Sequence, residues 1–160
     1  MNIVQIEENV KHLIHKIAQG ELSKQEFIYE LLLAYGHRSQ TIGRVRSGER
    51  NLNRDKENSV FWKRQIYFKI AKQQDLHGLI DQMKNEKRTE SNKIRFLIVT
   101  DFKTLLAVDT KTQDTLDVPF DDLAKKFDFF LPWAGMEKAV YQGENPADVK
   151  AAEKLAKLFD

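Results

Sequence analysis

The sequence contains no cysteine, only three prolines in 160 residues, and no long hydrophobic run. The lack of cysteine excludes disulfide bonds, thiolate metal sites and a cysteine nucleophile. No apolar stretch approaches the roughly 18 residues that a membrane-spanning helix needs. The first residues, MNIVQIEENV, are acidic where a secretory signal peptide is basic. These absences predict a cytoplasmic protein with no membrane partner.

A glycine-rich loop for phosphate or nucleotide binding is also missing from the sequence. This argues against a self-contained transferase, kinase or nucleotide hydrolase, because such enzymes hold phosphates with the backbone of a glycine-rich turn. His12 and His15 have the spacing of helical metal ligands. No paired acid or cysteine completes a set near them, so they are interpreted as surface histidines.

The positive charge of the chain is concentrated in one segment. The net charge is +2, but residues 37–72 hold ten Lys or Arg side chains against three acids, a balance of +7 that leaves −5 elsewhere. With 41% hydrophobic and 31% charged residues, the composition is that of a folded globular chain. A local excess of cations in such a chain favours a polyanionic partner, of which a nucleic-acid backbone is the commonest.

The order of the apolar patterns predicts an α+β fold with a mixed central sheet flanked by helices. Helices are expected at 3–17, at 23–35 (opened by a Ser23–Glu26 capping box) and at 75–86. Strands are expected within 59–70, at 94–100, at 104–109 and at 114–119. The continuous apolar run IRFLIVT at 94–100 indicates the centre of the sheet. Residues 37–58 are polar, basic and rich in turn residues, and RSGERNLNRDKEN (46–58) is predicted to be an exposed loop.

The strand QIYFKIA (65–71) has the outline of a nuclease strand of the carboxylate-x-lysine type. In such enzymes carboxylates hold a divalent ion that activates water, and the lysine stabilises charge on the phosphate. Lys69 matches the lysine, but Tyr67 stands where the acid belongs, and a neutral phenol is a poor ligand for Mg²⁺. Glu30 and Glu57 are the remaining candidate carboxylates. A degenerate site is therefore expected, with an active Mg²⁺-dependent endonuclease using Glu30, Glu57 and Lys69 as the alternative.

A second DNA-binding interpretation rests on SQTIGRVRSGERN (39–51). A short helix over 39–46, following another helix and a turn, has the form of a helix-turn-helix recognition segment, whose polar and Arg side chains enter the major groove. The strands expected after it do not belong to that motif, so this interpretation stays an alternative.

Four blocks of the sequence resemble a known family. They are FIYELLLAYG, IRFLIVTDFKTLLAVDTKT, DFFLPWAGMEKA and NPADVKAAEKLAKLFD. Together they resemble the N-terminal region of the single-chain, adenine-specific DNA methyltransferases of type IIG/IIL restriction-modification systems. The resemblance implies a nuclease-like domain, here residues 1–118, and a helical connector, here 119–160. It also implies a downstream adenine-N6 methyltransferase domain that uses S-adenosylmethionine, and a target-recognition domain.

The resemblance and the charge pattern together imply a role on DNA. The fragment is expected to be an excised front end that positions duplex DNA beside the methyltransferase domain and does not itself cleave it. A scaffold that packs on that domain without touching DNA is a further alternative. The expected phosphate contacts are Arg44, Arg46, Arg50, Lys63, Arg64 and Lys69.

Overall fold

Five strands form one mixed sheet at the centre of residues 1–137, the part of the chain that the computed structural model describes. They are β1 (Ser59–Trp62), β2 (Ile66–Ile70), β3 (Phe96–Thr100), β4 (Thr104–Asp109) and β5 (Thr115–Pro119), and they lie side by side in chain order. β2 and β3 are parallel and the other neighbours antiparallel. β3 lies in the middle with all of its residues buried, which confirms the prediction from its apolar sequence.

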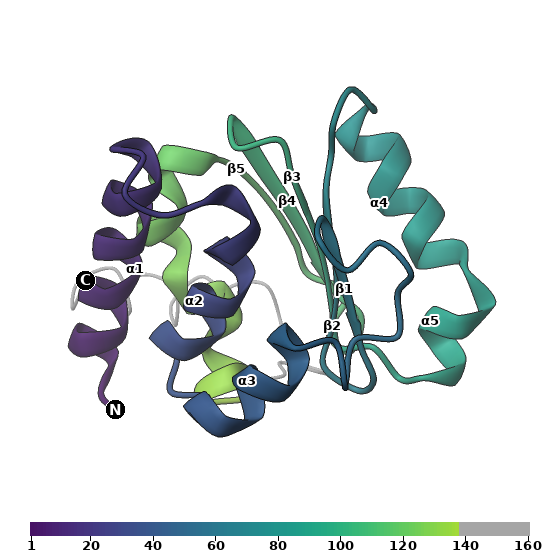
Figure 1. The fold of residues 1–160 in the computed structure, drawn as a ribbon, viewed down its shortest axis with the longest axis horizontal. Helices are drawn as coiled ribbons and strands as arrows, with labels where there is room; N and C mark the ends of the chain where they lie inside the picture. The colour runs from purple at the N-terminus through teal and green to yellow at the C-terminus, as the bar shows by residue number, and fades with distance from the viewer. Residues whose placement is uncertain (138–160) are drawn as a thin grey trace, which may run out of the picture.

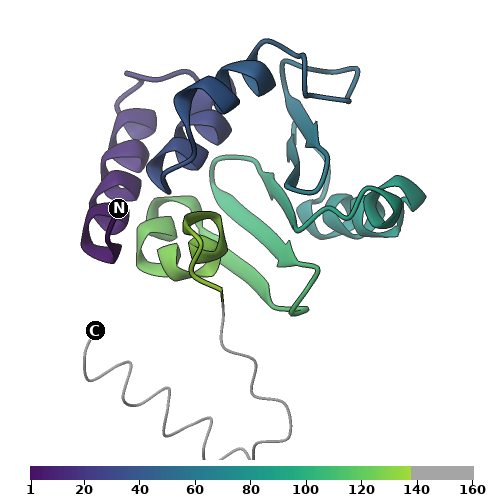
Figure 2. The same ribbon diagram turned by 90° about the horizontal axis from the view of Figure 1, so that it is seen from below.

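Helices cover both faces of the sheet (Figures 1 and 2). On one face lie α1 (Ile3–Ala18), α2 (Phe27–Ala34), α3 (Ser39–Arg46) and the 3-10 segment η2 (Phe120–Ala134); on the other lie α4 (Leu76–Asn85) and α5 (Lys87–Ser91). Alternate strand residues face the two layers. Phe68 packs against α2 and Phe96 against η2, whereas Tyr67 and Leu97 lie in the cluster that holds the buried residues of α4. The predicted α+β architecture with a mixed, helix-flanked sheet is confirmed.

The crossover between the parallel strands β2 and β3 is made by α4 and α5. Parallel neighbours need such a connection, because a tight hairpin can join only antiparallel strands. Asp75 caps α4 by accepting a hydrogen bond from the backbone N–H of Gly78 at 2.9 Å. Leu79, Ile80 and Met83 form its buried stripe. The crossover sets the C-terminal end of β2 beneath α4, where the pocket described below lies.

The start of the second helix differs from the sequence prediction. Ser23 makes no side-chain capping hydrogen bond, residues Lys24–Glu26 form a 3-10 turn (η1), and the α-helix begins at Phe27. The predicted capping box is therefore wrong. Glu26 instead points its carboxylate at Arg46 of α3, 3.3 Å from Nε, so its charge pairs with a neighbouring helix and not with its own N-terminus.

The polar segment 47–58 is not the wholly exposed loop that its composition suggests. Asn51 and Asn53 are 2% and 7% exposed. The Asn51 amide donates to the backbone oxygen of Ser59 at 2.8 Å and accepts from the backbone N–H of Phe61 at 2.9 Å. Asn53 donates to Ser59 Oγ at 2.8 Å. These hydrogen bonds lay the segment along β1, because each amide offers a donor and an acceptor, as a backbone peptide does.

The segment after β5 belongs to the main core. Phe120, Leu123 and Phe130 of η2 are buried in the cluster that also holds the apolar stripe of α1. Trp133 stacks on Phe130 with ring centroids 4.4 Å apart. Residues 120–134 of the predicted connector thus share the core of the sheet domain, while the proposed boundary at 118 stays a prediction. The remainder of the predicted helical connector, residues 138–160, lies outside the described residues.

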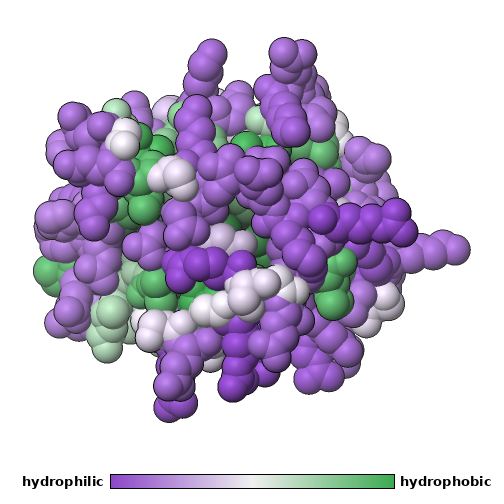
Figure 3. Space-filling view, viewed as in Figure 1, coloured by the Kyte–Doolittle hydropathy of each residue, from purple (hydrophilic) through white to green (hydrophobic). Residues whose placement is uncertain are grey.

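The surface is mostly polar. Hydrophilic side chains predominate on the face in Figure 3, and apolar ones show as separate patches. The large apolar side chains exposed in residues 1–137 are Met1, Ile3, Val4 and Leu52. In the same residues, no helix combines the length and apolar character that crossing a bilayer requires.

Candidate nucleic-acid interface

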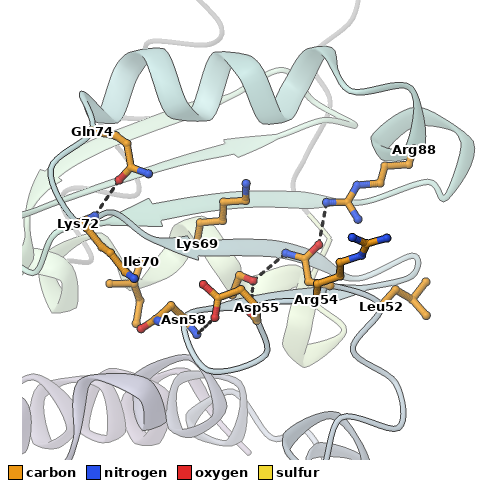
Figure 4. Close-up of a pocket in the computed structure, with 11 residues that line it drawn as sticks. Leu52, Arg54, Asp55, Asn58, Lys69, Ile70, Lys72, Gln74 and Arg88 are labelled. Carbon is orange, nitrogen blue, oxygen red and sulfur yellow. Dashed lines mark hydrogen bonds between the residues drawn. The ribbon is translucent and has the colours of Figure 1, made fainter.

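A basic pocket of about 520 Å³ lies at the C-terminal end of β2, between that strand and residues 52–59 (Figure 4). We call it the Lys69 pocket. Four cationic side chains line it: Arg54, Lys69, Lys72 and Arg88. Of the described residues that line it, Asp55 is the one acid. Four cations around one concave surface, with a single carboxylate among them, favour an anionic ligand.

Lys69 lies in the middle of this pocket. It pairs with Ser59 and Val99 in the ladders of β2, and it shares the α4 face of the sheet with Tyr67. Its ammonium is 5.5 Å from the centroid of the Tyr67 ring. Figure 4 shows the side chain extending from the strand into the space between Arg54, Arg88 and Lys72. A rigid strand therefore presents this charge to the pocket.

Arg88 is fixed at the wall of the pocket by four contacts. Its Nη2 donates to Asn53 Oδ1 and to the Tyr67 hydroxyl, each at 2.7 Å, and its Nε donates to Glu86 at 2.8 Å. The guanidinium also lies 4.3 Å from the centroid of the Phe61 ring. Glu86 offsets much of its charge, so Arg88 ties segment 52–59 to the sheet while Arg54, Lys69 and Lys72 carry the net charge.

Tyr67 occupies the position of the missing acid and stays a neutral phenol. Its hydroxyl donates to Glu86 at 2.6 Å. Burial, aided by the Glu86 carboxylate, raises the pKa of Tyr67 to about 12, although Arg88 opposes this shift. The residue therefore offers no anionic oxygen at neutral pH, and Mg²⁺ binds to hard, mostly anionic oxygen ligands.

The two glutamates proposed as metal ligands do not lie with Lys69. Glu30 is on α2, which covers the opposite face of the sheet, and its carboxylate is 3.7 Å from Arg46. Glu57 is exposed and does not line the Lys69 pocket. Asp55 does, and its carboxylate accepts the backbone N–H of Asn58. In residues 1–137, no three His, Asp or Glu side chains gather as a metal-binding group.

Three of the predicted phosphate contacts line a neighbouring hollow. Arg50, Lys63 and Arg64 line a space of about 420 Å³ at the turn between β1 and β2, and Glu49 is the one acid among its described lining residues. Leu52 lines both this space and the Lys69 pocket, so the two are adjacent. The structure thus brings Arg50, Lys63, Arg64 and Lys69 to one basic band along the β1–β2 hairpin.

Arg44 and Arg46 lie on α3, the helix of the helix-turn-helix interpretation. The helix forms where it was predicted, but a loop and β1 follow it. Arg46 pairs with Glu26 and Glu30, and its guanidinium lies 5.2 Å from the centroid of the Tyr29 ring. Much of its charge is therefore offset by neighbours within the domain. Arg44 is exposed, and its backbone oxygen accepts the N–H of Arg50. A DNA contact by either residue stays a prediction.

Comparison with known proteins identifies the family. Residues 1–160 match the family model described as the MmeI N-terminal domain. The chain belongs to this family. It is also 37% identical over 160 residues to DNA methyltransferase A of Bacillus subtilis (strain 168), a match that covers 100% of this chain and 18% of that protein. These matches confirm the resemblance seen in the sequence, and they mean that the chain spans less than a fifth of that relative. No solved structure matches, so the nuclease-like origin of the sheet stays a prediction.

Some residues of the pocket in this MmeI N-terminal domain were not singled out from the sequence. Arg54 and Lys72 were counted in the basic segment 37–72 but were not among the predicted phosphate contacts. Arg88 lies outside that segment and reaches the pocket only through α5. Asn53 supports Arg88 from a buried position in a polar stretch. The excess of positive charge in residues 37–72 was a sequence signal for Arg54 and Lys72. The places of Arg88 and Asn53 depend on tertiary contacts.

Proposed function

We propose that this chain is the front part of a restriction-modification DNA adenine-N6 methyltransferase, in which it holds duplex DNA by its phosphates without cutting it. The methyl transfer itself would take place in a downstream domain that binds S-adenosylmethionine. The DNA methyltransferase A relative supports the parent activity. The role of this domain is argued from the Lys69 pocket.

The observation that carries the proposal is the charge of that pocket. Arg54, Lys69 and Lys72 face one hollow that contains a single carboxylate, and Arg50, Lys63 and Arg64 continue the positive surface past Leu52. Lys and Arg contacts of this kind neutralise phosphates and set the position of a protein on the duplex. Because contacts to phosphates carry no sequence information, binding through these residues should be independent of sequence.

The same pocket argues against cleavage. A metal-dependent nuclease needs carboxylates that converge on the ion, because anionic oxygens must offset the loss of its hydration shell. Around Lys69 the position of the acid is taken by the neutral Tyr67, and Asp55 is the one lining acid among residues 1–137. Lys69 is therefore expected to bind a phosphate without taking part in its cleavage.

The chain is expected to bind duplex DNA weakly, without sequence preference, and with strong salt dependence. If about four phosphates are neutralised, affinity should fall roughly a hundredfold between about 50 mM and about 200 mM salt, through counterion release. Fluorescence anisotropy with two labelled duplexes of unrelated sequence measures both properties. Equal affinity for the two duplexes and a steep salt slope support the proposal. An absence of binding even at the lower salt concentration would instead favour the scaffold alternative.

The chain is also expected to leave supercoiled plasmid DNA unnicked in the presence of Mg²⁺ or Mn²⁺. A negative cleavage assay can reflect a missing recognition domain, so metal binding is measured as well, by the effect of the protein on water proton relaxation by Mn²⁺. We expect no stoichiometric Mn²⁺ site. Stoichiometric Mn²⁺ binding, or nicking that disappears in Lys69→Ala, would restore the endonuclease alternative.

A further inference from the structure

A second hollow lies at the opposite end of β2, where β2 and β3 begin. Its volume is about 600 Å³, within the range of small-molecule sites. It is bounded by the turn before β2, the turn before β3 and the end of η2. The residues that matter for its chemistry are His37, Arg64, Lys93, Arg95, Lys111 and Trp133. We call it the Trp133 pocket.

Two nitrogen atoms at this pocket have no hydrogen-bond partner. They are His37 Nε2 and Trp133 Nε1, and they are the two buried side-chain polar atoms without a partner among the described residues. Their rings are neighbours, with centroids 6.2 Å apart. Because buried polar groups are nearly always paired, two adjacent exceptions on residues that line one hollow point to a missing ligand.

The two nitrogens are complementary in hydrogen bonding. The indole N–H of Trp133 is a donor only. Burial lowers the pKa of His37, so its imidazole is neutral at pH 7, and Nε2 is an acceptor in the tautomer that carries its proton on Nδ1. A flat ligand edge that carries both an acceptor and a donor would satisfy the pair. Nucleobases carry such edges.

The rim of the pocket is cationic. Arg64 and Lys93 are both exposed and lie on adjoining turns, with the backbone N–H of Arg64 donating to the oxygen of Asn92 at 3.0 Å. Both have a left-handed backbone, with φ of 69° and 53°. The charges of Arg95 and Lys111 are offset by Glu137, and that of Arg95 also by the buried Asp109. Arg64 and Lys93 therefore provide most of the net charge available to an anion.

We propose that the Trp133 pocket binds a nucleotide, with its phosphate at Arg64 and Lys93 and the polar edge of its base at His37 and Trp133. The nucleotide is either a free mononucleotide or an unpaired nucleotide of a DNA strand, since both present the same groups. Because the two nitrogens are shielded from solvent without ligand, binding requires the two rings to rotate toward the hollow. The proposal does not depend on phosphate binding at the Lys69 pocket, which lies at the other end of β2.

Trp133 supplies the readout. The chain has two tryptophans, so Trp62→Phe leaves Trp133 as the sole indole. In this background, deoxyadenosine monophosphate should produce a saturable change in Trp133 fluorescence with a Kd below about 1 mM. Lys93→Ala should weaken binding at least about tenfold, because it removes one of the two charges that face the phosphate. His37→Phe should do the same while keeping an aromatic ring in place, and circular dichroism checks that this variant is folded.

Titrations with different ligands distinguish a free nucleotide from a nucleotide of a DNA strand, and both from a simple anion. A short single-stranded oligonucleotide that binds more tightly than the mononucleotide, and competes with it, identifies a DNA nucleotide; a mononucleotide that the oligonucleotide fails to displace identifies a free ligand. Inorganic phosphate that binds as well as the nucleotide would overturn the proposal in favour of a simple anion site. So would the absence of saturation by both nucleotide probes. Lys69→Ala serves as the matched control: it should weaken duplex binding and leave the mononucleotide titration unchanged.

Discussion

Replacing Arg54, Lys69 and Lys72 together by alanine is expected to weaken duplex DNA binding by about a hundredfold at about 0.1 M salt. The three cations surround one pocket and, unlike Arg88, are not held by a neighbouring carboxylate among the described residues. Each phosphate that the variant no longer neutralises should also reduce the slope of log affinity against log salt by about 0.9. Anisotropy titrations over a range of salt concentrations measure both effects. If each of the three cations neutralises one phosphate, the slope falls by about 2.7.

The matched control removes the same charge elsewhere. Lys11, Lys16 and Lys125 are exposed on α1 and η2, outside the basic band, and their triple alanine variant has the same net charge as the pocket variant. If DNA is held at the Lys69 pocket, the control should lose little affinity. Equal losses of affinity in the two variants would mean that DNA responds only to overall charge and would contradict a localised site.

Replacing Asp109 by alanine is expected to lower the free energy of unfolding by about 4 kcal/mol. Asp109 is fully buried at the end of β4, and its two oxygens accept from Arg95 Nε and Nη2 at 2.7 and 2.9 Å. Its Oδ1 also accepts the backbone N–H of Lys111, which orders the turn into β5. Alanine removes the acceptor for all of these donors at once. Urea unfolding followed by circular dichroism measures the destabilisation.

Two further variants make the Asp109 result specific. Asp109→Asn keeps an oxygen for the turn but loses the charge, so its destabilisation should lie between that of alanine and the wild type. Asp117→Ala removes an exposed carboxylate of β5 whose ion pair with His77 is at the surface, and should change stability by less than about 0.5 kcal/mol. A destabilisation below about 1 kcal/mol in Asp109→Ala would show that Arg95 finds a sufficient partner in Glu137.

The strands and the central position of β3 were predictable because their information is local. The run Ile94–Thr100 is mostly apolar and rich in branched residues, which is the pattern of a strand covered on both faces. The aromatic and branched residues that flank Lys63 and Arg64 indicated either one strand or two strands meeting there, and the structure forms two, β1 and β2. The substitution of Tyr67 for an acid was visible from spacing alone, and its high pKa agrees with the expectation of a neutral phenol.

The arrangement around Lys69 was less accessible to sequence reasoning. Glu30 was a reasonable ligand by residue type, but α2 packs on the face of the sheet opposite to Lys69. Arg88 reaches the pocket from a short helix at the end of the crossover. Contacts between residues so distant in the chain depend on how the layers pack, which periodicity within one element does not specify.

The polar segment before β1 shows a different reason for a missed prediction. A run of Asn, Arg, Asp and Lys has the composition of a solvated loop, yet Asn51 and Asn53 are among its most buried residues. Side-chain amides can replace backbone partners, and composition alone does not reveal where they do so. The capping-box prediction was wrong for a different reason. Ser23 and Glu26 are the residue types that such a box requires, but the Glu26 carboxylate pairs with Arg46 of α3.

The hydrogen bonds that Asn51 makes to the backbone of β1 also limit how this domain can associate with other chains. β1 is the outermost strand, and an open strand edge invites another chain to extend the sheet, either in aggregation or in β-augmentation by a partner peptide. Here three of the outward backbone groups of Ser59 and Phe61 are already paired: Asn51 binds the Ser59 oxygen and the Phe61 N–H, and the Leu52 N–H donates to the Phe61 oxygen at 2.9 Å. Because these groups are occupied, an incoming strand cannot form a full ladder along β1, and we expect partners that approach this edge to be recognised by the side chains of the basic band.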